Sequence, residues 1–155
     1  MVFIHLIKRE SVMKKTILIL SMFLISSTVN YGQEIKVEND SKEEVAVKSA
    51  NSWLKLVTDG NYGESWGKAA KLFKGAVTKE QWEKALGGLL PPFGALISRE
   101  VISAKYMTSI PGAPDGEYVI ISYKTQFEEK ENAIETVTPM MDEDGIWRVS
   151  GYFIK

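Results

Sequence analysis

The sequence predicts an α+β fold in which three N-terminal helices pack on a curved antiparallel sheet of about four strands. Between residues 46 and 89, apolar residues recur at the three-to-four-residue spacing of amphipathic helices. From residue 95 onward they alternate with polar residues, which is typical of half-buried strands. Because the helical segments and the strand segments are consecutive rather than interleaved, the pattern favours an antiparallel meander beside a helical layer.

Three segments carry the helical spacing. The first spans residues 46–57 and the second residues 62–73. The third begins at Thr78, whose hydroxyl can cap the helix while Gln81 reaches back to complete a capping box. Pro91 prevents this helix from continuing, since proline lacks the backbone N–H that a helix interior needs.

Four segments carry the strand pattern. In residues 95–110 the apolar parity slips near the middle, which predicts a bulge. Residues 118–127, 133–141 and 146–154 follow, and Pro139 in the third segment implies an edge or a bulge. In the last strand, the alternation predicts a shared core face. The residues expected on that face are Trp147, Val149 and Phe153, and those expected on the outer face of the sheet are Tyr118, Ile120 and Tyr152.

Two turns connect these strands. In the stretch "PGAPDG", Pro114 fits the first corner position and Gly116 is expected to supply a positive φ. We interpret this turn as a hairpin corner rather than as a nest of N–H groups that binds an anion. The stretch "DEDG" at residues 142–145 is a second hairpin signal.

The N-terminus has the layout of a secretory signal. Two lysines precede the apolar run at residues 17–25, and small and polar residues follow it. The apolar run is about half the length that spans a bilayer, which disfavours the alternative of a retained membrane anchor. We therefore expect a signal peptide at residues 1–32, with Met13 as an alternative start, and a periplasmic or secreted product. A flexible lead-in at residues 33–44 and one α+β domain at residues 45–155 are expected after cleavage.

Composition excludes several kinds of chemistry. Loss of the signal removes four basic residues and one acidic residue, which leaves 15 basic against 19 acidic residues and disfavours nucleic acid as a partner. The chain has no cysteine, and its one histidine, His5, precedes the expected cleavage site. Imidazole acid–base catalysis, thiol nucleophiles and His or Cys metal ligands are thus all disfavoured. We expect no cofactor, no metal and no catalytic residue, and the oligomeric state stays open.

Several stretches resemble one bacterial family. They include "SWLKLVTDGNYGESW", "VTKEQWEKAL", "PGAPDGEYVIISYKTQFEEK" and "ETVTPMMDEDGIWRVSGYF", in this order along residues 46–153. In these motifs the chain is similar to family 4019 of the domains of unknown function. The resemblance implies a small cone of the cystatin or nuclear-transport-factor-two-like type. It implies no activity, so no catalytic residue is carried over.

A small set of polar residues on different strands is the candidate ligand site. Glu135 shares strand parity with Val137 and can face the interior. The other members are Arg99, Glu117, Tyr123 and Tyr152. A buried Glu–Arg pair can bind a polar ligand, act as a base if the carboxyl pKa is raised, or serve only as a structural ion pair. We expect a non-catalytic module that binds a small molecule or a protein; a small enzyme with a Glu/Tyr acid–base set and a structural envelope subunit are the alternatives.

Overall fold

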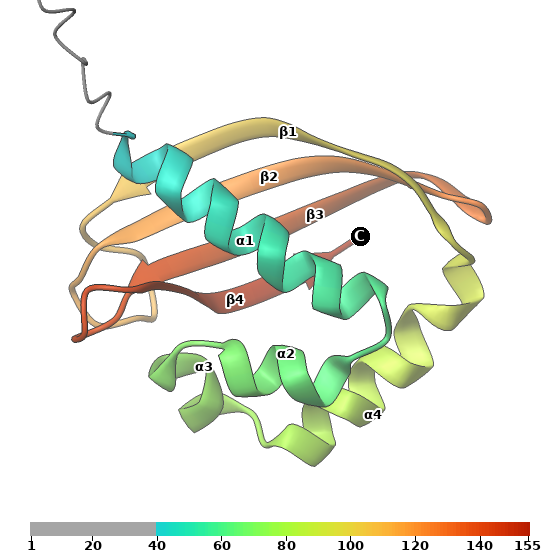
Figure 1. Ribbon diagram of the computed structural model, residues 1–155, viewed down its shortest axis with the longest axis horizontal. Helices are drawn as coiled ribbons and strands as arrows, with labels where there is room; N and C mark the ends of the chain where they lie inside the picture. Colours follow the sequence, from blue (N-terminus) through green and yellow to red (C-terminus); the bar gives the residue numbers. More distant parts are fainter. Residues whose placement is uncertain (1–39) are drawn as a thin grey trace, which may run out of the picture. The chain divides into compact units, whose positions relative to one another are not determined.

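A computed structural model describes residues 40–155 (Figure 1). The expected signal peptide and residues 33–39 of the expected lead-in lie outside the described residues. The elements are α1 (Lys42–Thr58), α2 (Tyr62–Lys68), α3 (Lys71–Ala76), α4 (Lys79–Leu89), the 3-10 helix η1 (Pro91–Phe93), β1 (Leu96–Met107), β2 (Tyr118–Phe127), β3 (Lys130–Met141) and β4 (Trp147–Ile154).

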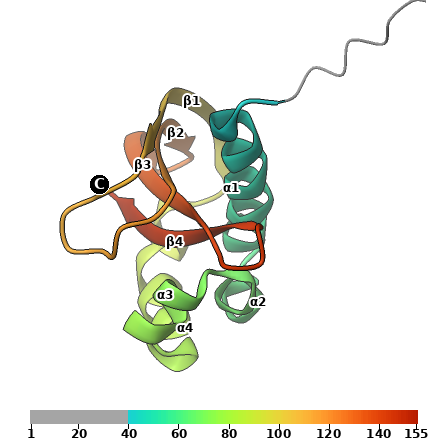
Figure 2. The same ribbon diagram turned by 90° about the vertical axis from the view of Figure 1, so that its left-hand side faces the viewer.

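The predicted α+β class is confirmed. The strands form one antiparallel sheet in the order β1-β2-β3-β4, so each strand pairs with its neighbour in sequence. Helix α1 lies across the concave face of the sheet and contacts all four strands (Figure 1). The sheet curves over α1. Helices α2, α3 and α4 lie at the β4 side of the sheet, below β4 in Figure 2. Within residues 40–155, no helix combines the length and the apolar character that a membrane span needs.

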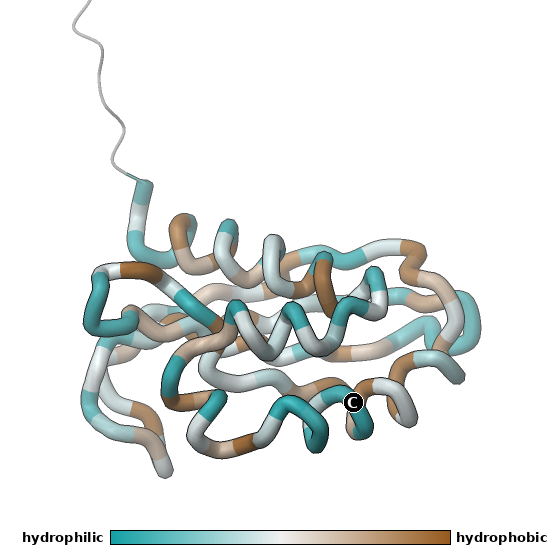
Figure 3. Tube along the Cα trace, turned by 60° about the horizontal axis from the view of Figure 1, so that its bottom comes forward, coloured by the Kyte–Doolittle hydropathy of each residue, from teal (hydrophilic) through white to brown (hydrophobic). Residues whose placement is uncertain are grey.

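Helix α1 begins earlier than the expected domain boundary at residue 45. The Ser41 side chain accepts the Glu44 N–H, and the Glu44 carboxylate accepts the Ser41 N–H at 2.8 Å, which makes a capping box. Hydrophobic and hydrophilic residues alternate along the helix (Figure 3). Its buried residues all lie within the predicted helical segment 46–57 and share one face, namely Ala46, Ala50, Trp53, Leu54 and Val57.

The second predicted helix is two helices, so the domain has four α-helices rather than three. The break falls at Ala69 and Ala70, which are extended with ψ of 164° and 157°. Ala70 N–H donates to Val149 O at 2.9 Å, on the edge strand β4. The apolar spacing continues across the break because both alanines are buried, but the Ala70 N–H binds the sheet edge instead of a helical carbonyl. Helix α4 has the predicted capping box between Thr78 and Gln81.

Bulges change which strand residues face the core. The register of β1 against β2 shifts at Ile97 and again at Ile102, which confirms the predicted bulge near the middle. A third shift lies opposite Pro139, which confirms the bulge that this proline implied, with Ser150 as the additional residue on β4.

The shift at Ser150 corrects the predicted faces of β4. Trp147 and Val149 are buried as expected, but Tyr152 takes the core-facing position beyond the bulge. Phe153, which was expected in the core, lies opposite Thr136 with 60% of its surface exposed. An additional residue in a strand moves each side chain after it to the opposite face of the sheet.

The "PGAPDG" loop folds over the outer face of the sheet. Its positive φ is at Gly112 (82°) and not at Gly116, so that prediction is wrong. The Ala113 N–H donates to Ile110 O at 3.3 Å, which places the Pro-Gly pair at the centre of a type II turn. Tyr118, which was expected on the outer face of the sheet, is fully buried, and its hydroxyl donates to Pro114 O of this loop at 2.7 Å. The "DEDG" hairpin is confirmed by the bond from Gly145 N–H to Asp142 O at 2.9 Å.

The core between the helices and the sheet is rich in aromatic rings. Trp53 packs against Trp82 with centroids 5.7 Å apart and against Tyr152 at 5.6 Å. Buried Ser65 supplies the indole partners, since its O accepts Trp53 Nε1 at 2.7 Å and its Oγ accepts Trp82 Nε1 at 2.9 Å. Trp147 is also buried in this core. The tryptophans thus serve packing rather than an open aromatic cage.

Candidate functional site

Glu135 is the one charged residue that the described domain buries completely. It lies on β3 opposite Tyr123 of β2 and Ile154 of β4, on the concave face of the sheet. Its carboxylate accepts four hydrogen bonds. These come from Arg99 Nε at 2.5 Å, Arg99 Nη2 at 3.1 Å, Thr125 Oγ1 at 2.6 Å and Tyr152 OH at 2.7 Å.

These contacts decide what the Glu135 carboxylate can do. Two parallel N–H bonds from one guanidinium are the strong, geometrically defined form of a carboxylate–arginine pair. An ionised carboxylate offers about four lone-pair sites, and here four donors occupy them. Burial without such partners would be prohibitive for a charge. Glu135 is therefore a fixed counter-ion for Arg99, with no lone pair left for a substrate proton.

Arg99 reaches this carboxylate from β1, the edge strand. Its side chain is 11% exposed, and its Nη1 donates to Thr58 Oγ1 at 3.2 Å, at the end of α1. A guanidinium has five N–H groups, and three have protein partners here. Two N–H groups of Arg99 thus have no partner within residues 40–155. The bonds to Glu135 and Thr58 nevertheless hold the guanidinium in one orientation.

The two tyrosines are neutral hydrogen-bond donors. Burial, followed by the neighbouring Glu135 charge, raises the pKa of Tyr152 far above its ordinary value. Burial raises the pKa of Tyr123 to about 12, and its hydroxyl donates to Asn51 Oδ1 at 2.9 Å. Both phenols stay protonated near neutral pH, so neither serves as a base or a ready proton donor there.

The structure brings together three of the five candidate residues and places a fourth beside them. Arg99, Glu135 and Tyr152 are in direct contact, and Tyr123 is the ladder partner of Glu135. Glu117 is not part of this cluster. It precedes β2 and pairs with Lys42 Nζ at 2.8 Å, in the first turn of α1.

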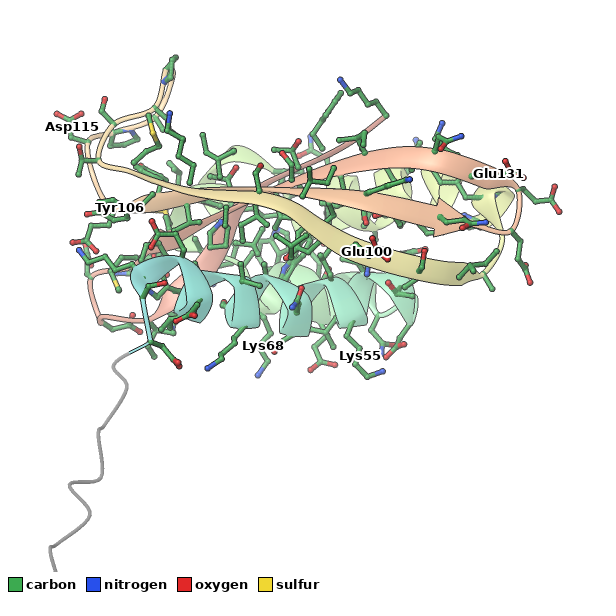
Figure 4. All side chains as sticks on the ribbon, turned by 90° about the horizontal axis from the view of Figure 1, so that it is seen from above. Lys55, Lys68, Glu100, Tyr106, Asp115 and Glu131 are labelled. Atoms are coloured by element: carbon green, nitrogen blue, oxygen red, sulfur yellow. The ribbon has the colours of Figure 1, made fainter. Side chains whose placement is uncertain are left out.

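The reason for this separation is the length of the strands. Glu117 is two residues from Asp115, and Glu135 is four residues from Glu131. Asp115 and Glu131 lie at opposite ends of the sheet (Figure 4). Shared membership of the sheet therefore does not bring these two acidic residues together.

Two hollows adjoin Arg99, lined by residues at the end of α1 and the start of β1. Figure 1 shows these two element ends on its right side. The first, called the inner hollow, has a volume of about 110 Å³ and reaches Glu135 and Phe127. The second, called the outer hollow, has a volume of about 360 Å³. The outer hollow is lined by Asn51, Lys55, Thr58, Asp59, Leu96 and Arg99. Thr58, Leu96 and Arg99 line both hollows, so the two hollows adjoin at these residues.

Sequence reasoning missed several residues of this site. Thr125 had a usable signal, because it shares strand parity with the apolar Tyr123 and Phe127 and so is a polar residue on a core-facing row. Thr58 and Asp59 had no such signal, since polar residues are common where a helix ends at a turn and so do not indicate a site. Within residues 40–155, no group of three or more acidic residues is arranged to hold a metal ion.

Comparison with models of protein families identifies the family of the chain. A family model described as a protein of unknown function (DUF4019) matches residues 49–152. The chain belongs to this family. The resemblance read from the sequence motifs is thereby confirmed, and the matched region includes Thr58, Arg99, Thr125, Glu135 and Tyr152. Comparison with curated proteins gives no significant match.

Proposed function

We propose that this member of the DUF4019 family is an exported, non-catalytic module that binds a small polar ligand at Arg99. The observation that carries the proposal is the state of the guanidinium. Three of its N–H groups are bound to Glu135 and Thr58, while it lines both hollows with two N–H groups left over. A rigid donor beside a cavity is what a binding site for a ligand oxygen needs, because little order is lost on binding.

The size of the site suits a small molecule. Pockets for drug-sized ligands are typically about 300–1,000 Å³. The outer hollow, at about 360 Å³, is at the lower end of that range, and the inner hollow, at about 110 Å³, holds only a few atoms. A ligand of a few heavy atoms that presents an acceptor oxygen to Arg99 fits these dimensions.

Catalysis by a Glu/Tyr acid–base set has little support from this geometry. A general base needs a lone pair within reach of the substrate proton. The Glu135 oxygens already accept four donors, and the Tyr152 hydroxyl is one of these donors. Enzymatic use of Glu135 would require this network to open, so binding is the simpler function.

Two further parts of the proposal concern export and fold relationship; the first rests on the sequence and the second on the architecture. The basic, apolar and then small-residue order of residues 13–32 supports export to the periplasm or the medium. A long helix against a curved four-stranded meander supports a cystatin-like or nuclear-transport-factor-two-like relationship. Sequencing the N-terminus of protein recovered from the host tests the export proposal, and an intact residue 1 would contradict it.

Native mass spectrometry of the protein purified from its own host tests the binding proposal. We expect a retained small molecule in the wild type and its loss in Arg99→Lys, because an ammonium cannot reproduce the planar fork. Lys71→Ala is the matched control, since within residues 40–155 the only ion pair of Lys71 is with exposed Glu143. Retention of the same molecule by Arg99→Lys, or binding of no ligand by a folded wild type, would overturn the proposal.

A further inference from the structure

The outer hollow has a donor side and an acceptor side. Arg99 forms the donor side, because it lines this hollow and has two N–H groups without a partner within residues 40–155. The acceptor side is the end of α1, where Thr58 is the last helical residue and Asp59 is the C-cap. The carbonyl end of a helix carries a negative partial charge that favours a cation. The Asp59 carboxylate adds a full negative charge at the same end.

The formal charges around the hollow cancel. Arg99 is balanced by buried Glu135, and Lys55 is balanced by Asp59 at 2.8 Å. A ligand with a net charge would meet a partner of opposite sign on only one side of the hollow, at either Arg99 or Asp59. A ligand with one positive and one negative group would satisfy both sides, because each of its charges meets a partner of opposite sign.

The two ion pairs differ in how readily they exchange partners. The Arg99–Glu135 pair is bidentate, and its side chains are 11% and 0% exposed. The Lys55–Asp59 pair joins side chains that are 74% and 42% exposed, and exposed pairs of this spacing are weak. A ligand ammonium can therefore replace Lys55 at Asp59, whereas nothing small replaces Glu135 at Arg99.

We propose that the ligand of this site is a small zwitterion, with its carboxylate on Arg99 and its ammonium at Asp59 and the end of α1. This inference rests on the proposed function and specifies the ligand class. The carboxylate accepts the two remaining guanidinium N–H groups, which are the donors that carboxylates prefer. The ammonium takes the place of the Lys55 side chain.

Calorimetric titration of the full-length chain with simple probes tests the ligand class. The probes are ω-amino acids from glycine to 5-aminopentanoate as zwitterions, propionate as the carboxylate alone and ethylamine as the ammonium alone. We expect the best zwitterion to bind at least about tenfold more tightly than propionate, with ethylamine the weakest. Asp59→Asn should lower zwitterion affinity to the level of propionate and leave propionate binding unchanged.

The outcomes separate this inference from the proposed function. If propionate binds as tightly as every zwitterion and Asp59→Asn has no effect, the zwitterion is wrong and binding at Arg99 stands. If no probe binds and the wild type retains no molecule from its host, both proposals fail. Lys71→Ala should bind every probe as the wild type does, and a melting curve for Asp59→Asn shows that the variant is folded.

Discussion

Replacement of Arg99 by methionine tests the central claim that this side chain keeps Glu135 buried as an anion. Methionine resembles the aliphatic stem of arginine but has no side-chain N–H groups, so Glu135 loses two of its four donors and its only bidentate partner. Thr125 and Tyr152 still donate to it, but neither carries a charge. The change therefore leaves a buried carboxylate without a counter-ion.

The expected loss follows from the geometry of the pair. Removal of one partner from a buried ion pair typically destabilises a protein by about 3–5 kcal/mol. Because Arg99 is 11% exposed and lines the inner hollow, water can partly hydrate the carboxylate in the variant. We expect a loss of about 3 kcal/mol, at the lower end of that range. This is a large share of the 5–15 kcal/mol that stabilises a typical domain.

Urea unfolding followed by tryptophan fluorescence measures this loss, because Trp53 and Trp82 are buried in the native state. The double variant Arg99→Met/Glu135→Gln is the decisive comparison. The glutamine oxygen accepts one of the two hydroxyls of Thr125 and Tyr152, and its NH2 group can donate to the oxygen of the other. The site then no longer holds a charge. The double variant should therefore be more stable than Arg99→Met alone. A single-variant loss below about 1 kcal/mol, or a double variant no more stable than the single one, would refute the reasoning.

Four other substitutions test this site and other parts of the domain. Tyr152→Phe removes the 2.7 Å donor to Glu135 and should cost about 1–3 kcal/mol in urea unfolding; an unchanged midpoint would contradict this. Because burial raises the pKa of Tyr152 above the ordinary value of about 10, its contribution to stability is complete below pH ~10 and is lost above it. The wild type should thus lose stability more steeply than Tyr152→Phe between about pH 9 and pH 11, and parallel curves would rule this out. Ser65→Ala removes the acceptor of a buried indole N–H at 2.9 Å and should cost about 1–3 kcal/mol, which the same unfolding assay measures; a change within its error would argue against that bond. Gly112→Ala should lower the melting temperature, at a cost of about 1–2 kcal/mol, because its φ is 82°, whereas Gly67→Ala, in an exposed and open part of α2, should raise it; the opposite order would contradict this.

The sequence predicts most of the fold because local signals and packing agree along most of the chain. The capping box at Thr78 and the parity slip in β1 are local features that the tertiary structure leaves unchanged. The second helix was mispredicted because Ala69 and Ala70 keep helical spacing while Ala70 binds the edge of β4. That partner is more than seventy residues away in sequence, so no local pattern reveals it.

The candidate site was predictable to a similar extent. Glu135 and Arg99 are polar residues on strand parities that otherwise read as core, and this anomaly identifies them from sequence. Tyr152 was identified as a candidate, but its face was wrong because Ser150 is an additional residue that alternation alone does not reveal. The prediction that Glu117 belongs to the site was wrong, because strand parity gives the face of a residue but not its position along the strand.

The two bulges of β1 have a consequence for the protein in solution at high concentration. β1 is an edge strand of twelve residues with exposed Ile97, Val101 and Ile102, a composition that invites fibril growth by stacking of chains. Fibril-forming segments need roughly six or seven evenly spaced residues. The bulges at Ile97 and Ile102 leave regular runs of only four and five, at residues 98–101 and 103–107. The bulges thus add to the protection that the exposed charged residues Glu100 and Lys105 give this edge against templated aggregation.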